Sequence, residues 1–219
     1  MRNGIMREKK AEMLKASETA PSEVLNGSEN LSKEYLARCL KILNKWGAPL
    51  TGWHCIDVVD VREEDAEAEL LNNELWTCEL WTCELCGCKK VRFIHVMDNA
   101  LYFEPVRVGC ICAGVMEGDV LAAKERERRM RNRAKRRRTF VKHKWEHPRS
   151  GLWYRVYHGQ ELMITEYSGA YYVQMGQGQR ARMTSKYKGR PIRDLYSAFY
   201  AAFDLVDPKD SFWEVFKEV

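Results

Sequence analysis

Four cysteines in two closely spaced pairs are the residues whose types and spacing most clearly indicate chemistry. Cys83 and Cys86 are separated by two residues and followed by glycine, and Cys110 and Cys112 are separated by one residue. Each pair can bind a metal ion from a single turn, and four thiolates complete the tetrahedral coordination of Zn²⁺. We therefore predict one structural Zn²⁺ bound by all four cysteines. A site closed by four thiolates has no open position for water, so metal-assisted catalysis is not implied.

Two further cysteines are alternative ligands. Cys88 follows Cys86 at the one-residue spacing of the second pair. Cys78 arises from a tandem duplication, because residues 74–78 and 79–83 both read ELWTC. Only one copy can occupy the metal-binding turn, and Cys83 has the two-residue spacing to Cys86. Replacement of a predicted ligand by Cys88 or Cys78 remains open at this point.

The cellular compartment is indicated by what the N-terminus lacks. It has no apolar region of the kind found in signal peptides, and no stretch of the chain approaches the roughly 20 apolar residues of a membrane span. We expect a cytoplasmic protein with no membrane partner. In a reducing compartment, eight cysteines favour metal binding over disulfides.

The charges are distributed very unevenly along the chain. The net charge is +5, but residues 57–84 contain ten acids and one base, and residues 124–138 contain ten bases and two acids. Arginine binds phosphate through two parallel hydrogen bonds, so an Arg-rich segment favours a nucleic-acid partner over a merely solvated surface. Pairing of the basic segment with the acidic one is the simpler alternative. The candidate phosphate-binding residues are Arg126, Arg128, Arg129, Arg131, Arg133, Lys135, Arg136, Arg137 and Arg138.

A second basic run lies between residues 180 and 193 and contains no acid. It could supply further contacts to nucleic acid. The candidates in it are Arg180, Arg182, Lys186, Lys188 and Arg190.

The elements that must position these residues indicate an α+β protein in three parts. Residues 1–30 have little apolar periodicity and read as a disordered or frayed arm. Residues 31–140 read as a helix capped by Ser32 and ended by Gly47, a strand at 53–61, a zinc hairpin with strands at 90–96 and 102–109, and a long basic helix at 113–138. Residues 141–219 read as a three-stranded antiparallel sheet packed on one helix. Its strands are predicted at 153–157, 163–167 and 170–175, and its helix follows Asp194.

Two stretches resemble known families. Cys83-Glu-Leu-Cys86-Gly, the hairpin, Cys110-Ile-Cys112-Ala-Gly114 and the Arg-rich segment together resemble a zinc ribbon, over residues 76–138. Uncharacterised bacterial and phage proteins often carry such a module beside an Arg-rich helix. Zinc ribbons usually present the CxxC pattern twice, whereas the second pair here is CxC.

The segment 149–206 resembles the three-strand-plus-helix DNA-binding domains of phage integrases and plant ethylene-response factors. In those domains the sheet enters the major groove. The resemblance implies that Arg155, Tyr157 and Thr165 face the groove.

The leading prediction is a non-enzymatic, zinc-stabilised nucleic-acid-binding protein of a bacterium or its mobile elements, with DNA favoured over RNA. One alternative is an anti-defence inhibitor from a phage or mobile element, for example an anti-CRISPR, that binds a protein–nucleic-acid complex such as a CRISPR effector. A third hypothesis is a metal-dependent nuclease. Its candidate residues, which no spacing motif ties together, are His54, Asp57, Asp60 and His95.

Overall fold

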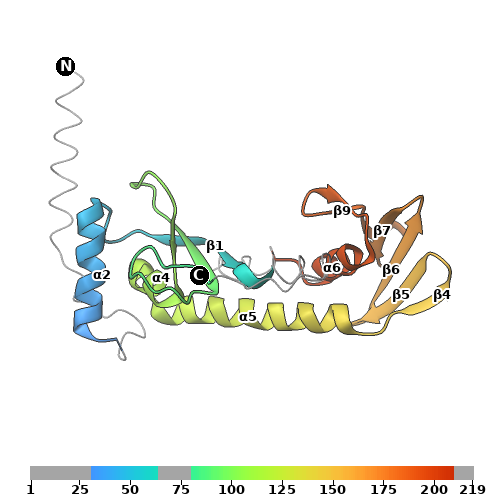
Figure 1. The fold of residues 1–219 in the computed structure, drawn as a ribbon, viewed down its shortest axis with the longest axis horizontal. Coiled ribbons are helices and arrows are strands. Elements are labelled where there is room, and N and C mark those ends of the chain that lie inside the picture. The colour runs from blue at the N-terminus through green and yellow to red at the C-terminus, as the bar shows by residue number, and fades with distance from the viewer. Residues whose placement is uncertain (1–30, 64–79, 210–219) are drawn as a thin grey trace, which may run out of the picture. The chain divides into compact units, whose positions relative to one another are not determined.

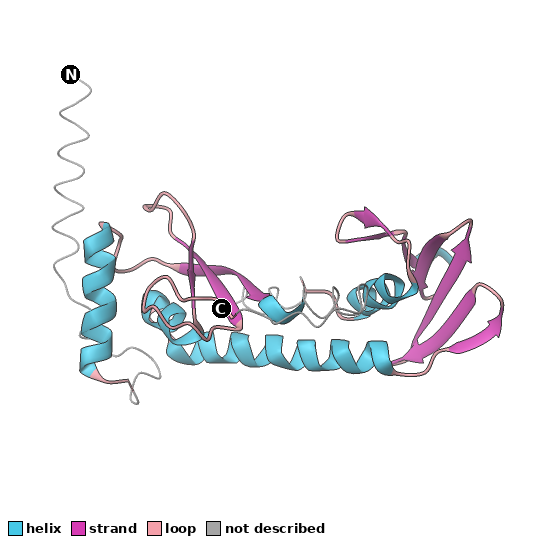
Figure 2. Cartoon of the chain, viewed as in Figure 1, coloured by secondary structure: helices cyan, strands magenta, loops and turns pink. Residues whose placement is uncertain are grey.

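The computed structural model describes residues 31–63 and 80–209 (Figure 1). The predicted N-terminal arm, most of the acidic segment and Cys78 lie outside the described residues. The described residues form two compact units, one made of 31–62 with 80–130 and the other of Glu63 with 131–209. The boundary lies inside a long helix, whereas the sequence indicated a boundary near residue 140. Helices and antiparallel strands occur in both units, which confirms the α+β class (Figure 2).

The first unit contains a three-stranded antiparallel sheet with the strands in chain order. The predicted hairpin is present, since His95 pairs with Val108 and Met97 with Val106. The strand predicted at 53–61 pairs with the first strand of this hairpin, on the side away from the second. The strands are β1 (His54–Asp60), β2 (Phe93–Asp98) and β3 (Val106–Val108).

Helix α2 (Lys33–Trp46) precedes this sheet and begins and ends where the sequence predicts. The Ser32 hydroxyl accepts a hydrogen bond from the backbone N–H of Tyr35 at 3.2 Å, as an N-cap residue should. Gly47 ends the helix in the left-handed conformation, with a φ of 65°. Cys39 and Leu43, one turn apart on the same face, are fully buried and hold α2 against the core of the first unit.

The predicted basic helix is in fact two helices, α4 (Cys110–Glu117) and α5 (Val120–Lys142). Gly118 stops α4 in the left-handed region with a φ of 85°, and the Asp119 carboxylate caps α5 by accepting from the Ala122 N–H at 2.9 Å. The two helices meet closely at Gly114, where a Cβ would lie 2.5 Å from the Cα of Val120.

The second unit contains a five-stranded antiparallel sheet in chain order, where the sequence predicted three strands. The three predicted strands are its centre, and one further strand pairs along each edge. The two edge strands are short and mostly exposed, so they carry no alternating apolar signal. The strands are β4 (Glu146–Arg149), β5 (Leu152–Tyr157), β6 (Gln160–Tyr167), β7 (Ala170–Met175) and β8 (Arg182–Thr184).

Helix α6 (Leu195–Val206) follows Asp194, whose carboxylate caps it by accepting from the Ser197 N–H at 2.8 Å. It packs in one core with the buried side chains Leu162 and Ile164 of β6 and Val173 of β7. Between the sheet and α6 come a short 3-10 turn η1 (Gly178–Arg180) and a two-stranded hairpin, β9 (Lys186–Tyr187) with β10 (Arg190–Pro191).

Candidate metal centre and basic surfaces

Three of the four predicted zinc ligands come together in the first unit. The sulfur atoms of Cys83, Cys86 and Cys112 all lie within 4.8 Å of one another. Four sulfurs bound to one Zn²⁺ at about 2.3 Å stand about 3.8 Å apart in a tetrahedron, so these three are close enough to hold a metal ion. In the part of the chain that the structure describes, they form the one such group of histidine, cysteine or acidic side chains.

The Cys83–Gly87 turn presents the first two sulfurs. Trp81 and Val91 exchange backbone hydrogen bonds at 2.9 and 3.1 Å, so the chain before the turn is paired with the chain after it. Within the turn the Gly87 N–H donates to the Cys83 carbonyl at 2.9 Å, and Gly87 adopts a φ of 73°. Glycine takes this left-handed conformation without steric cost, so it allows the chain to reverse directly after the second cysteine.

Cys112 and Cys110 diverge because both lie in the first turn of α4. Residues two apart on an α-helix are about 200° apart around its axis, so their side chains do not face each other. Cys112 points to the cysteine group, whereas Cys110 lies beside Glu127 of α5 and outside that group. Burial raises the pKa of the Cys110 thiol to about 12. The spacing of the pair predicted a turn with two convergent thiols, and a helical first turn is incompatible with that geometry.

Hydrogen bonds support the grouped sulfurs. The Gly109 N–H donates to the Cys83 sulfur at 3.3 Å, and the Tyr35 hydroxyl lies 3.0 Å from the Cys112 sulfur. The adjacent Cys112 side chain lowers the pKa of Cys83 to about 5, against the opposing effect of burial. Cys83 therefore forms the thiolate, the form that binds metal, more readily than an ordinary cysteine does.

Among the other cysteines, Cys88 is exposed and outside the group, although its carbonyl accepts from the Cys83 N–H at 2.8 Å. Cys39 was read in the sequence only as an apolar member of a helix. It is fully buried in the same core cluster as Cys83 and Cys112. The neighbouring Cys112 side chain lowers the pKa of Cys39. One signal in the sequence could have drawn attention to Cys39. Tyr35 lies four residues before it, which places the two side chains on the same face of a helix.

The residues considered for a nuclease do not converge in the structure. Asp60 is buried and bound through both oxygens by Arg92, at 2.8 and 2.9 Å. His95 is fully buried, and His54 lies at the opposite end of β1 from Asp60, 3.6 Å from Asp98.

Three of the predicted phosphate-binding arginines are buried instead. Arg126 is 6% exposed, and Arg133 and Arg137 are each 4% exposed. In the first unit Arg126 forms an ion pair with Glu117, whose other oxygen accepts from the Cys55 N–H at 2.8 Å. These three guanidinium groups have structural roles, so they cannot reach a phosphate in this conformation.

In the second unit, Arg133 and Arg137 attach α5 to α6. Arg133 donates to the Asp204 carboxylate at 2.6 Å and to the Asp207 carbonyl at 2.9 Å, which is the C-terminal end of α6. A cation at that end is favoured by the helix dipole. Arg137 lies 3.9 Å from the ring centre of Tyr200 and 3.3 Å from the Glu63 carboxylate.

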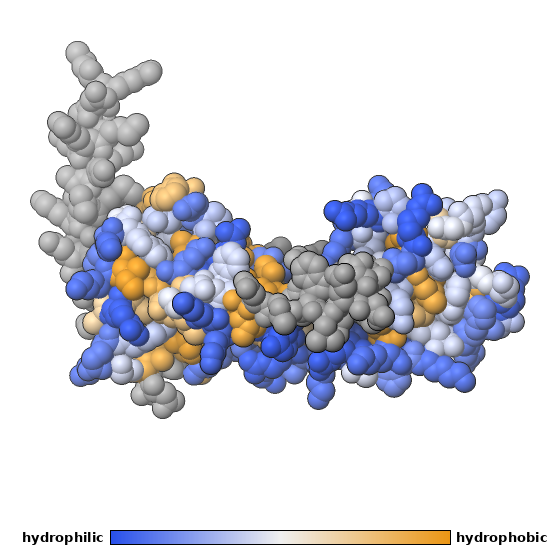
Figure 3. All heavy atoms as spheres, viewed as in Figure 1, coloured by the Kyte–Doolittle hydropathy of each residue, from blue (hydrophilic) through white to orange (hydrophobic). Residues whose placement is uncertain are grey.

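The opposite side of the same helix segment is exposed and cationic. Four basic residues follow one another at steps of four, three and four positions and are all exposed: Arg131, Lys135, Arg138 and Lys142. This spacing places them on one face of α5. Figure 3 shows hydrophilic side chains along the lower edge of the view, where α5 lies. We call this set of four residues the α5 cationic face.

Three other arginines of this segment form ion pairs with acidic side chains. Arg128 and Arg129 bind Glu125 at 2.7 and 2.9 Å, and Arg136 binds Asp207 at 2.7 Å. Arg128 and Arg136 are nevertheless exposed.

Arg155 and Tyr157 lie on the covered face of the sheet. Arg155 pairs in register with the fully buried Leu162, so it shares the face that packs against α6. Its guanidinium group lies 4.5 Å from the ring centre of Phe140 and donates to the Phe140 carbonyl at 2.8 Å. Side chains alternate along a strand, so Thr165 of β6 projects to the opposite face from Ile164 and hence from Arg155. The three therefore cannot present one groove-binding surface.

The second basic run is fully exposed. Its residues are distributed over η1, β8 and the β9–β10 hairpin, and Figure 1 shows β9 on the side of α6 away from α5. It is a separate surface from the α5 cationic face. The exposed residues are Arg180, Arg182, Lys186, Lys188 and Arg190.

Comparisons with protein-family models, with curated proteins and with solved structures gave no match for this chain. Among the described residues, no helix has the length and apolar character needed to cross a membrane. The function must therefore be inferred from the sites themselves.

Proposed function

We propose that this protein is a non-enzymatic nucleic-acid-binding protein whose first unit is stabilised by one Zn²⁺. The observation that carries the nucleic-acid proposal is the α5 cationic face. Four basic side chains on one exposed helix face form an elongated positive surface, and the phosphate backbone is the elongated negative partner that matches it.

The division of the arginines supports the same proposal. Burial of Arg133 and Arg137 against α6 fixes the rotation of α5 about its own axis. The α5 cationic face is then held outward by a rigid support rather than by a loose helix. Such preorganisation reduces the entropy that binding must cost.

Zinc is the ion that fits the cysteine group best. Three sulfurs from cysteines are a soft ligand set, which selects Zn²⁺ over Mg²⁺ or Ca²⁺. A metal bound there would connect the 83–87 turn to α4 and would act on folding, not on a reaction.

The salt dependence of DNA binding tests the proposal. If the α5 cationic face contacts four phosphates, affinity for duplex DNA should fall about 100-fold between 50 and 200 mM salt. We expect the triple variant Arg131→Ala, Lys135→Ala and Arg138→Ala to bind more weakly and with a shallower salt slope, by about three units. Fluorescence anisotropy on duplex DNA, single-stranded DNA and RNA measures both quantities.

The matched control is the triple variant Arg180→Ala, Lys186→Ala and Arg190→Ala, which removes equal charge from the other basic surface. Wild-type binding no tighter than that of a scrambled basic peptide would reject the proposal. An equal loss from both triple variants would also reject it, because only net charge would then matter.

A protein partner is the second candidate, and one observation favours it. The loop between β2 and β3 exposes 64% of Leu101 and 80% of Phe103. Inhibitors of nucleic-acid-handling complexes bind through such apolar contacts together with charge. A pull-down from nuclease-treated lysate should then retain a partner that Phe103→Ser loses. Loss of all partners after nuclease treatment would leave nucleic acid as the binding target.

A further inference from the structure

Three sulfurs leave a tetrahedral ion one ligand short. Structural zinc sites are almost always closed by four protein ligands. The sequence assigned the fourth position to Cys110, but α4 directs that side chain elsewhere. The chain must supply another ligand or leave the site open to water.

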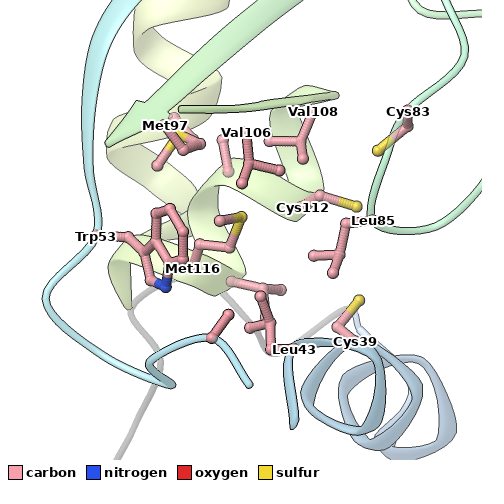
Figure 4. Close-up of a cluster of buried hydrophobic side chains, with 14 of the residues drawn as sticks. Cys39, Leu43, Trp53, Cys83, Leu85, Met97, Val106, Val108, Cys112 and Met116 are labelled. Atoms are coloured by element: carbon pink, nitrogen blue, oxygen red, sulfur yellow. The ribbon is translucent and has the colours of Figure 1, made fainter. Parts of the chain in front are cut away.

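Cys39 of α2 is the cysteine best placed to close the site. It has 0% exposure and belongs to the core cluster that also contains Cys83, Leu85 and Cys112. Figure 4 shows its thiol on the side of α2 that faces Cys112 and Leu85. Its sulfur is not in the group of three that lie within 4.8 Å of one another, so binding requires it to move closer.

A second contact already joins α2 to the cysteine group. Tyr35 lies one helical turn before Cys39, on the same face of α2, and its hydroxyl is 3.0 Å from the Cys112 sulfur. A phenol O–H that donates to a metal-bound thiolate is a typical supporting contact for a metal ligand. The face of α2 that carries Cys39 is thus held against the group by an independent interaction.

The other described cysteines are engaged elsewhere or face solvent. The Cys55 thiol donates to the Asp57 carbonyl at 3.2 Å. Cys88 is exposed, and Cys110 lies beside Glu127.

We propose that Cys39 is the fourth ligand, so that one Zn²⁺ is bound by Cys39, Cys83, Cys86 and Cys112. The ion then joins three segments that are far apart in sequence: α2, the 83–87 turn and α4. The inference rests on the proposed zinc site and adds to it both the closing ligand and the attachment of α2.

X-ray absorption spectroscopy on the zinc-loaded wild-type protein tests the ligand count without any substitution. The proposal predicts four sulfurs at about 2.3 Å and no nitrogen or oxygen ligand. Three sulfurs with one lighter ligand would overturn the role of Cys39 while the zinc site itself stands. Absence of bound metal would overturn the zinc site as well.

Cobalt titration of serine variants identifies the fourth sulfur. Cys39→Ser should weaken Co²⁺ binding on the order of 100-fold, an even share of the affinity of a four-ligand site. Its visible absorption bands should also move to shorter wavelength, because oxygen replaces sulfur. Cys110→Ser and Cys88→Ser are the matched controls, and neither should change affinity or spectrum.

If Cys39→Ser does not fold, four controls decide the question together with the wild-type sulfur count. These are the single serine variants of Cys55, Cys78, Cys88 and Cys110. A four-sulfur site that all four variants retain supports Cys39. Loss of one sulfur in any of them assigns the fourth position to that cysteine and overturns the proposal.

Discussion

The two units of this protein fill their cores with different chemistry. The core of the first unit gathers sulfur, with Cys39, Cys83 and Cys112 all at most 1% exposed. The core of the second gathers aromatic rings and pairs them with guanidinium groups. One core is suited to closure by a metal ion, and the other closes with cation–π contacts and buried ion pairs.

The two units also differ in how regular their structure is. The sheet of the first unit has one strand of only three residues, and its cysteine turn has little regular structure of its own. A metal ion bound by the cysteine group would hold that turn against its neighbours. The second unit has five paired strands packed on helix α6, and its core, in the residues that the structure describes, contains no cysteine.

Helix α5 shows how position alone decides what an arginine does. Arg137 and Arg138 are neighbours in sequence, yet the first is 4% exposed and the second faces solvent. A rotation of about 100° per residue separates a structural role from a candidate binding role. Counting charges along the segment could not reveal that division.

The largest expected effect is on the second unit, from Arg137→Ala. The substitution leaves the Glu63 carboxylate without its nearest guanidinium group and removes a cation from the Tyr200 ring. Breaking a buried ion pair costs about 4 kcal/mol. We expect the free energy of unfolding of the second unit to fall by that amount in urea denaturation.

The neighbouring substitution Arg138→Ala is the control, and it should change stability by less than about 0.5 kcal/mol. Equal losses of unfolding free energy in the two variants would show that burial gives Arg137 no larger role in stability than the exposed Arg138 has.

The next effect belongs to the first unit and depends on pH. Burial, with a smaller contribution from Arg126, lowers the pKa of His95 from 6.5 to about 4. Between these two pH values His95 binds a proton in the unfolded chain but not in the folded chain. The free energy of unfolding therefore falls as the pH drops from 6.5 towards 4. Between pH 7 and pH 5 the loss is about 2 kcal/mol, from a shift worth about 1.4 kcal/mol per pH unit below the unfolded pKa.

His95→Leu should remove this part of the pH dependence, whereas the exposed His143→Gln should keep it. Any release of metal in acid would be the same in the wild-type protein and in both variants, so comparing their urea denaturation at pH 7 and pH 5 isolates the effect of His95. A variant with the full wild-type pH dependence would mean that His95 is not the responsible group.

The smallest effect concerns the support of the metal site. Tyr35→Phe removes the hydroxyl 3.0 Å from the Cys112 sulfur but keeps the ring. Loss of a supporting hydrogen bond lowers metal affinity by about tenfold. Competition with a chromophoric chelator measures it, and Tyr102→Phe in the same core cluster is the control. Unchanged metal affinity in Tyr35→Phe would show that this hydroxyl group of α2 does not support the candidate metal site.

Patterns of single elements could be predicted from the sequence, and their tertiary partners could not. The caps of α2 and α6, the hairpin of the first unit and the three central strands of the second all followed from local signals. The Gly118-Asp119 break is also a local signal, a helix stop followed by a helix start, but it lies inside the range predicted as one basic helix.

The candidate metal site was predicted in part for the same reason. Cys83 and Cys86 lie in one turn, and their spacing alone indicates that both could bind the same metal ion. Cys110 was misjudged because a CxC pair in a helix diverges. Cys39 is 44 residues from Cys83 in sequence, and only the packing of α2 brings the two into one cluster.

Hydrogen exchange with and without a zinc chelator tests most directly whether the two units rely on different chemistry. If a metal ion closes the first unit alone, chelation should remove amide protection from α2 and from residues 80–92. Strands β5 to β7 and helix α6 should keep theirs. Unchanged protection in α2, or equal loss of protection in both units, would contradict this prediction.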